Sequence, residues 1–174
     1  GAAAGVLAGG VSAACFFPAT GRPGYAHCWI YLLGSAQPRA RWESASDAMR
    51  EADRVRPGAG ETHLARAGVR YRFYLDFDGA LRDLAAAQHT LPNSTEVFEL
   101  RGYVERRQGH WAKSAVSLEK ALELDPRNFF ILQQIALSYQ PLRRYAEMTS
   151  ALDRALLLAP HDTDTRVTRA AVDL

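Results

Sequence analysis

Apolar and polar residues alternate along the middle of the chain with the spacing of amphipathic helices. Between Thr95 and Asn128 there are two such stripes, joined at Gln108-Gly109-His110 and closed at Asp125-Pro126. Apolar residues that recur every three or four positions predict helices rather than strands. Glycine and proline mark the joint and the end of the second helix. The stretch therefore predicts two helices connected by a tight turn.

The same pattern returns when the sequence is shifted by 34 positions in either direction. Each copy has a large residue, a small one, an aromatic one, then a large and a small one, and a closing proline. The three copies are Leu64, Gly68, Phe77, Leu84, Ala87, Pro92; Phe98, Gly102, Trp111, Leu118, Ala121, Pro126; and Leu132, Ala136, Tyr145, Leu152, Ala155, Pro160. A less regular copy with Trp29, Trp42, Met49 and Pro57 precedes them. Self-similarity at this period predicts a helical repeat array, in which each unit buries its apolar face against its neighbours.

This pattern resembles the tetratricopeptide repeat (TPR) family over about residues 24–162. The resemblance implies an all-α fold, a right-handed α-solenoid of about four helix-turn-helix repeats with a C-terminal capping helix. We expect a leader at residues 1–22 and a repeat array at 23–174, with repeats at about 24–59, 61–94, 95–128 and 129–162 and a cap at 163–174. Leu33, Arg101 and Met148 depart from the family pattern and predict looser packing nearby.

Residues 1–21 carry no charge and are rich in glycine and alanine. Their length fits a membrane span, with Gly1, Gly5 and Gly9 at small-xxx-small spacing. They also fit the end of a secretion signal cut near Ser12-Ala13-Ala14, or a poorly ordered leader. We expect a cytoplasmic protein, or a membrane-anchored or exported one if this leader is a transmembrane or signal remnant. Membrane contact is expected only through residues 1–21.

The composition excludes several other functions. Twenty-one basic residues nearly balance nineteen acidic ones, so the net charge of +2 does not predict nucleic-acid binding. Cys15 and Cys28 lack the spacing of a zinc or redox pair, and His27 beside Cys28 lacks further ligands. We find no phosphate-binding glycine loop, metalloprotease motif or nucleophile elbow. The sequence therefore predicts no enzyme activity, no metal and no cofactor.

The resemblance also implies where a partner binds, because in this family the first helix of each repeat lines a concave groove. The residues that this places in the groove are Ile30, Val69, Arg72, Phe73, Glu99, Tyr103, Arg106, Arg107, Phe130, Gln133 and Leu137. The aromatic residues offer rigid apolar area, and the arginines can hold carboxylates. Alternatively, the arginines are a solvated helix end. The Lys and Asn clamp with which some family members hold chaperone tails is missing, because Arg66, Glu96 and Leu100 occupy its places.

We therefore expect a non-catalytic scaffold that binds a peptide or a partner helix. The run from Glu105 to Tyr139 resembles the repeat arms of large bacterial signalling and regulatory proteins. Two other functions stay open: a module that positions substrate for an enzyme's catalytic domain outside this chain, and a membrane-tethered assembly factor. Weak self-association through the ends of the array is a further expectation.

Overall fold

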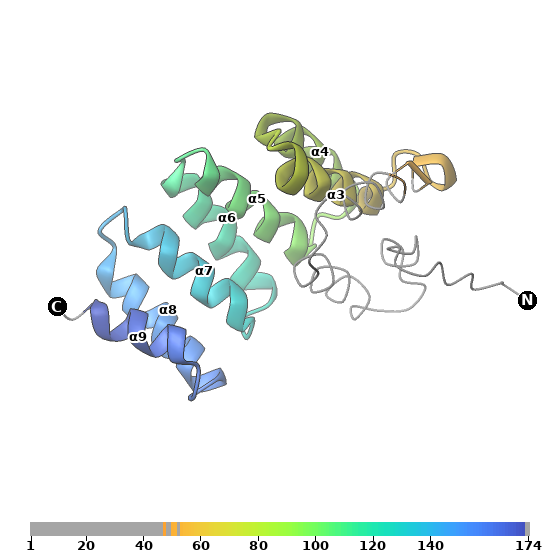
Figure 1. Cartoon of the computed structure of the whole chain (residues 1–174). Helices are drawn as coiled ribbons and strands as arrows, with labels where there is room; N and C mark the ends of the chain where they lie inside the picture. Colours follow the sequence, from red (N-terminus) through yellow and green to blue (C-terminus); the bar gives the residue numbers. More distant parts are fainter. Residues whose placement is uncertain (1–46, 48–49, 52, 173–174) are drawn as a thin grey trace, which may run out of the picture. The chain divides into compact units, whose positions relative to one another are not determined.

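The computed structural model describes residues 47, 50–51 and 53–172, and the regular structure of these residues is helical (Figure 1). With the labels of Figure 1, the helices are α3 (Gly60–Val69), α4 (Phe77–Thr90), α5 (Thr95–Arg107), α6 (Trp111–Leu124), α7 (Phe129–Tyr139), α8 (Tyr145–Leu158) and α9 (Thr163–Ala171), and the π-helical segment η2 (Arg70–Tyr74) extends α3. The all-α prediction is confirmed. The expected leader and most of the expected first repeat lie outside the described residues.

The chain separates into two compact units, one ending at Leu91 and the other beginning at Pro92. In the first unit α3 and η2 pack against α4, and in the second α5 packs against α6, α6 against α7, and α7 against α8. We call α3, α5 and α7, which open the pairs, A helices, and α4, α6 and α8 B helices.

The N-terminal caps of α5, α7 and α9 are spaced 34 residues apart, so α9 begins in the register of an A helix. Oxygens of Ser94, Asn128 and Asp162 accept hydrogen bonds from the backbone N–H groups of Val97, Ile131 and Thr165 at 3.3, 3.1 and 2.9 Å. Each cap satisfies one of the N–H groups that a helix start leaves without an intrahelical partner. Asp76 caps α4 in the same way, since its carboxylate accepts a hydrogen bond from the backbone N–H of Gly79 at 2.8 Å.

Each joint between an A helix and its B helix contains one residue in the left-handed backbone region. Leu75, Gly109 and Arg143 have φ angles of 53°, 77° and 57° and are 34 positions apart. Only glycine adopts this region without steric cost, so two of the three joints are strained. The first joint also differs from the second in its backbone hydrogen bonds. The N–H of Asp76 donates to the carbonyl of Arg70 in the π-helical segment, whereas the N–H of His110 donates to the carbonyl of Glu105.

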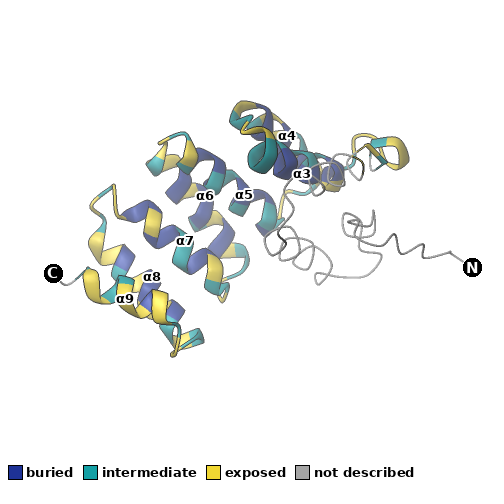
Figure 2. Cartoon of the chain, viewed as in Figure 1, coloured by how far each residue is buried: buried dark blue, intermediate teal, exposed yellow. Residues whose placement is uncertain are grey.

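The core of the second unit consists of the repeated large and small positions predicted from the sequence. Leu118, Leu132 and Leu152 are buried together with the small residues between them (Figure 2). Gly102 marks the tightest approach, since a Cβ atom there would lie 2.6 Å from the Cγ atom of Leu118. The small residue thus permits α5 and α6 to pack in contact.

The helix pair of the first unit is joined differently, by a buried carboxylate. Asp83 of α4 accepts a hydrogen bond from the Nε atom of Arg66 at 2.8 Å, and its other carboxylate oxygen forms an ion pair with Arg70, whose Nε atom lies 3.1 Å away. The hydrogen bond that Arg66 donates to Asp83 raises the pKa of Arg66. One repeat later, Leu100 and Val104 occupy the positions of the two arginines and are buried. The sequence analysis missed this network.

Part of the side of α9 that corresponds to the buried side of α7 is exposed. α9 packs against α8, while Arg166 and Ala170, which correspond to the buried Leu132 and Ala136, are exposed. A charged residue in place of a buried leucine is typical of the terminal helix of an array. The predicted capping helix is therefore present.

Candidate partner-binding surface

The predicted partner-binding residues of α7 share one helix face. Phe130 is 68% exposed and Leu137 is 41% exposed. They are separated by two helical turns, and Gln133 lies between them on the same side. α7 therefore presents two large apolar side chains to solvent, although its opposite face lies in the core.

The predicted residues of α5 form a network of contacts of their own. The hydroxyl of Tyr103 donates to Glu99 at 2.5 Å. Arg106 donates to the backbone carbonyl of Gln134 on α7 at 3.0 Å and to its side-chain oxygen at 2.6 Å. The guanidinium carbon of Arg106 also lies 5.6 Å from the centre of the Tyr103 ring. These side chains connect α5 to α7. Arg107, at the end of α5, is exposed.

The predicted residues of the first unit differ in accessibility. Val69 is only 4% exposed, so it offers almost no surface to a partner. Arg72 and Phe73 lie in η2 and are half-buried, with the Arg72 guanidinium 5.8 Å from the ring centre of Tyr71. Ile30 lies outside the described residues. Of the predicted residues of α5, Arg106 is connected to α7, through Gln134, which was not among the predicted residues.

Helix α9 adds residues that the sequence analysis did not place at this site. Gln133 donates to Asp162 at 3.1 Å and to the hydroxyl of Thr165 at 2.7 Å, which ties the exposed face of α7 to the start of α9. Hydrogen bonds from Thr165, first of all from its hydroxyl, and from Gln133 lower the pKa of Asp162. Val167, which is 64% exposed, and Ala171 correspond to Gln133 and Leu137 one repeat earlier. Continuing the 34-residue register past residue 162 would have found them.

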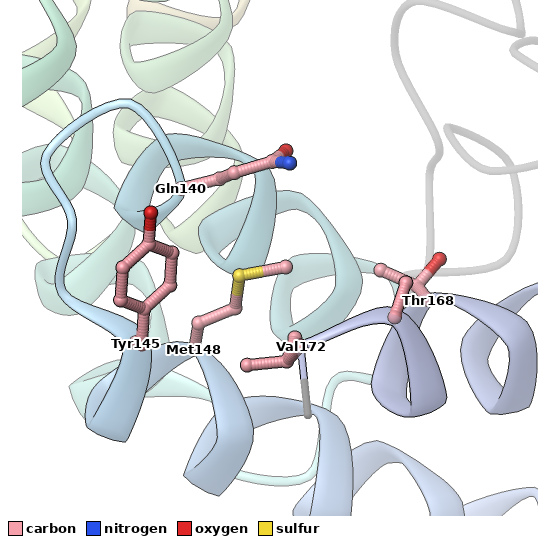
Figure 3. A pocket seen from close by; sticks show the side chains of 6 residues that line it. Gln140, Tyr145, Met148, Thr168 and Val172 are labelled. Carbon is pink, nitrogen blue, oxygen red and sulfur yellow. The ribbon is translucent and has the colours of Figure 1, made fainter. Parts of the chain in front are cut away.

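We call the surface formed by Phe130, Gln133 and Leu137 of α7 with Val167 and Ala171 of α9 the α7–α9 face. It borders a pocket of about 420 Å³. The pocket lining consists of Gln140, Tyr145, Met148, Thr168, Ala171 and Val172. Figure 3 shows the thioether of Met148 between the ring of Tyr145 and the side chains of Thr168 and Val172.

Two residues that line this pocket differ from their counterparts one repeat earlier. Met148 corresponds to Ser114 of α6, whose hydroxyl lies 2.9 Å from that of Ser138 on α7. Tyr145 corresponds to Trp111, and because about half of Tyr145 is exposed its ring forms one side of the pocket.

Among the described residues, no cluster of three or more His, Cys, Asp or Glu side chains is arranged to hold a metal ion. In the same part of the chain no helix has the length and apolar character needed to cross a bilayer.

Solved structures of other proteins share this arrangement. The first TPR domain of Spaghetti (RPAP3), solved with an HSP90 peptide, has a TM-score of 0.62 at 12% identity over 66% of this chain and 90% of that one. For PilF of Pseudomonas aeruginosa the TM-score is 0.68 at 18% identity, over 78% and 61%. For a thermophilic TPR protein of Thermus thermophilus it is 0.62 at 20% identity, over 86% and 90%.

The chain has the tetratricopeptide repeat fold. No protein-family model and no curated protein matches its sequence. At these identities the likeness concerns the fold alone, so the function has to be argued from the TPR surface itself.

Proposed function

We propose that this TPR chain is a non-catalytic scaffold that binds a protein partner through the α7–α9 face. The observation that carries the proposal is the exposure of Phe130 and Leu137 on α7 and of Val167 on the corresponding face of α9, one repeat later. Large apolar side chains that gather on one folded surface are typical of protein interaction sites. The bridge from Gln133 to the start of α9 supports a preformed surface, which reduces the entropy lost on binding.

Two further observations bear on the partner. A TPR domain of similar fold was solved with an HSP90 peptide, which supports a peptide or a helix as the ligand class. The position of one clamp residue is here Leu100, which is buried, and another is Arg66, which is ion-paired to Asp83. These two positions favour a partner other than a chaperone tail.

The wider role that we propose is that of an interaction arm within a larger bacterial signalling or regulatory protein. It is supported by the alanine- and arginine-rich run from Glu105 to Tyr139, which resembles the repeat arms of such proteins.

Affinity capture from the source cell's lysate tests the binding face. The parent chain is compared with a Phe130→Asp, Leu137→Asp double variant and with Val116→Asp as a matched control. Val116 lies on α6 and is 64% exposed, so its substitution changes a similar apolar surface elsewhere. Helicity measured by circular dichroism must be equal in all three.

We expect a partner that the parent and the Val116 variant capture and the α7 double variant loses. Equal capture by all three proteins would refute the assignment of the α7–α9 face. Loss in the Val116 variant alone would place the contact on the B helices instead.

A further inference from the structure

Two charged residues of α5, Arg106 and Glu99, are held in intramolecular contacts. Arg106 is fixed by two hydrogen bonds to Gln134 and lies against the ring of Tyr103. Glu99 accepts a hydrogen bond from the hydroxyl of Tyr103. A partner that used these groups would have to replace those contacts. These two groups are therefore not readily available to a partner.

The five residues of the α7–α9 face are uncharged, and the exposed carboxylate of Asp164, one turn before Val167 on α9, lies at the edge of this face. A charged group of a partner would lose hydration over these five residues without gaining an opposite charge. An apolar side chain, in contrast, gains from every exposed apolar atom that it covers. The face therefore selects an apolar partner surface.

The pocket continues this face, because Ala171 belongs to both. Its remaining lining contributes the thioether of Met148, the ring of Tyr145, the side chain of Val172 and two uncharged polar groups. At about 420 Å³ it lies within the range of clefts that hold small molecules and buried side chains. Apolar pockets of this kind receive the anchor residues that dominate interface energies.

We propose that the pocket between α8 and α9 is the anchor site for one bulky aliphatic or aromatic side chain of a partner α-helix that lies along the α7–α9 face. The proposal rests on the proposed function and specifies its ligand. Phe130 and Leu137 lie about 10 Å apart along α7, at a rise of about 1.5 Å per residue. An amphipathic helix with apolar residues at i, i+4 and i+7 presents a stripe of the same length. Such a helix needs no acidic residue in its contact surface.

The test is a selection from a displayed library of helical peptides of about 18 residues, which at a rise of about 1.5 Å per residue are long enough to span the face. The parent chain is the bait, and the selected peptides are then titrated against two variants. Ala171→Phe fills the pocket from the end of α9. Ala170→Phe is the control, because Ala170 is the adjacent exposed alanine and does not line the pocket.

We expect the selected peptides to carry bulky apolar residues at helical spacing without a shared acidic position. Ala171→Phe should weaken their binding by about tenfold or more, and Ala170→Phe by less than about twofold. Raising NaCl from about 50 to 500 mM should not weaken binding, since no ion pair contributes. Circular dichroism shows whether each variant keeps the parent's helicity.

Each contrary result has a distinct meaning. Peptides that share acidic residues and dissociate in salt would overturn the apolar anchor while leaving the scaffold function intact. Equal affinity for the Ala171 and Ala170 variants would exclude the pocket as the anchor site. If no peptide is selected, or if Phe130→Asp does not weaken the selected ones, the α7–α9 face fails as a binding surface and the anchor fails with it. A peptide-independent dimer in sedimentation that Ala171→Phe abolishes would replace the partner helix by a second copy of this chain.

Discussion

The left-handed residues at the joints allow one stability prediction to be worked out in detail. Gly109 and Arg143 occupy the same place in successive joints of the second unit, with φ angles of 77° and 57°. A residue other than glycine in this region costs about 1–2 kcal/mol. Replacing Arg143 with glycine removes that cost, but the unfolded chain gains entropy equivalent to about 0.5–1 kcal/mol. Because the Arg143 side chain is exposed, little packing is lost.

The net effect of Arg143→Gly is therefore a gain of about 0.5–1 kcal/mol in the free energy of unfolding. The reciprocal change, Gly109→Ala, should lower it by about 1 kcal/mol. A Cβ atom at Gly109 meets no atom within 4 Å, so this loss is purely a backbone effect. Leu75→Gly should be nearly neutral: Leu75 is 66% exposed, and the third that is buried offsets the relief of strain.

Urea unfolding followed by circular dichroism measures all three variants. With a slope of about 1–3 kcal/mol per molar urea, a change of about 1 kcal/mol moves the midpoint by about 0.3–1 M. The midpoint should rise for Arg143→Gly and fall for Gly109→Ala. A lower midpoint for Arg143→Gly, or no change for Gly109→Ala, would refute the assignment of strain to these joints. The slope must stay constant for the comparison to hold.

Three further predictions concern packing, the buried ion pair and pH. Gly102→Ala should destabilise the second unit by about 1–2 kcal/mol despite the better helix propensity of alanine, since the new methyl group collides with Leu118; an unchanged thermal midpoint would contradict this. Asp83→Ala should cost about 2 kcal/mol in urea unfolding, whereas replacing the whole network by the residues of the next repeat should be neutral or stabilising; equal losses in both variants would argue against the network's role. Because the pKa of Asp162 is lowered on folding, its contribution is complete above its ordinary pKa and is lost as the pH falls through the lowered value. The difference in thermal midpoint between the parent and Asp162→Asn should therefore shrink in acid, and a constant difference would show that the carboxylate is not the stabilising group.

The local pattern was sufficient to predict the helices. The predicted joint at Gln108-Gly109-His110 separates α5 from α6, and α6 ends at Leu124, directly before the predicted stop at Asp125-Pro126. Glycine or proline at the joints and polar caps at the starts act over three or four residues, so the printed sequence contains their whole cause. The same holds for the small residues of the core, because the 34-residue period identifies them before any contact is known.

The candidate site was predictable only in part. The register placed Phe130 and Leu137 on one face, and both are exposed. It did not reveal that Arg106 is bound to Gln134, or that the site extends onto α9 through Gln133. These contacts join residues about 30 positions apart, and a hydrogen bond at that separation depends on how two helices pack.

The order of the amino acids alone accounts for the helical repeat: its period, its caps, its joints and the small positions where helices approach. These depend on backbone sterics and on local spacing. The packing of the helices, in contrast, determines how the remaining residues are used: Asp83 as a buried partner of two arginines, Tyr145 as a half-exposed pocket wall, Val167 as part of the proposed binding face. The physical reason is that the energy of a polar or exposed side chain depends on which groups of another helix surround it, and neighbours in the sequence do not determine those groups.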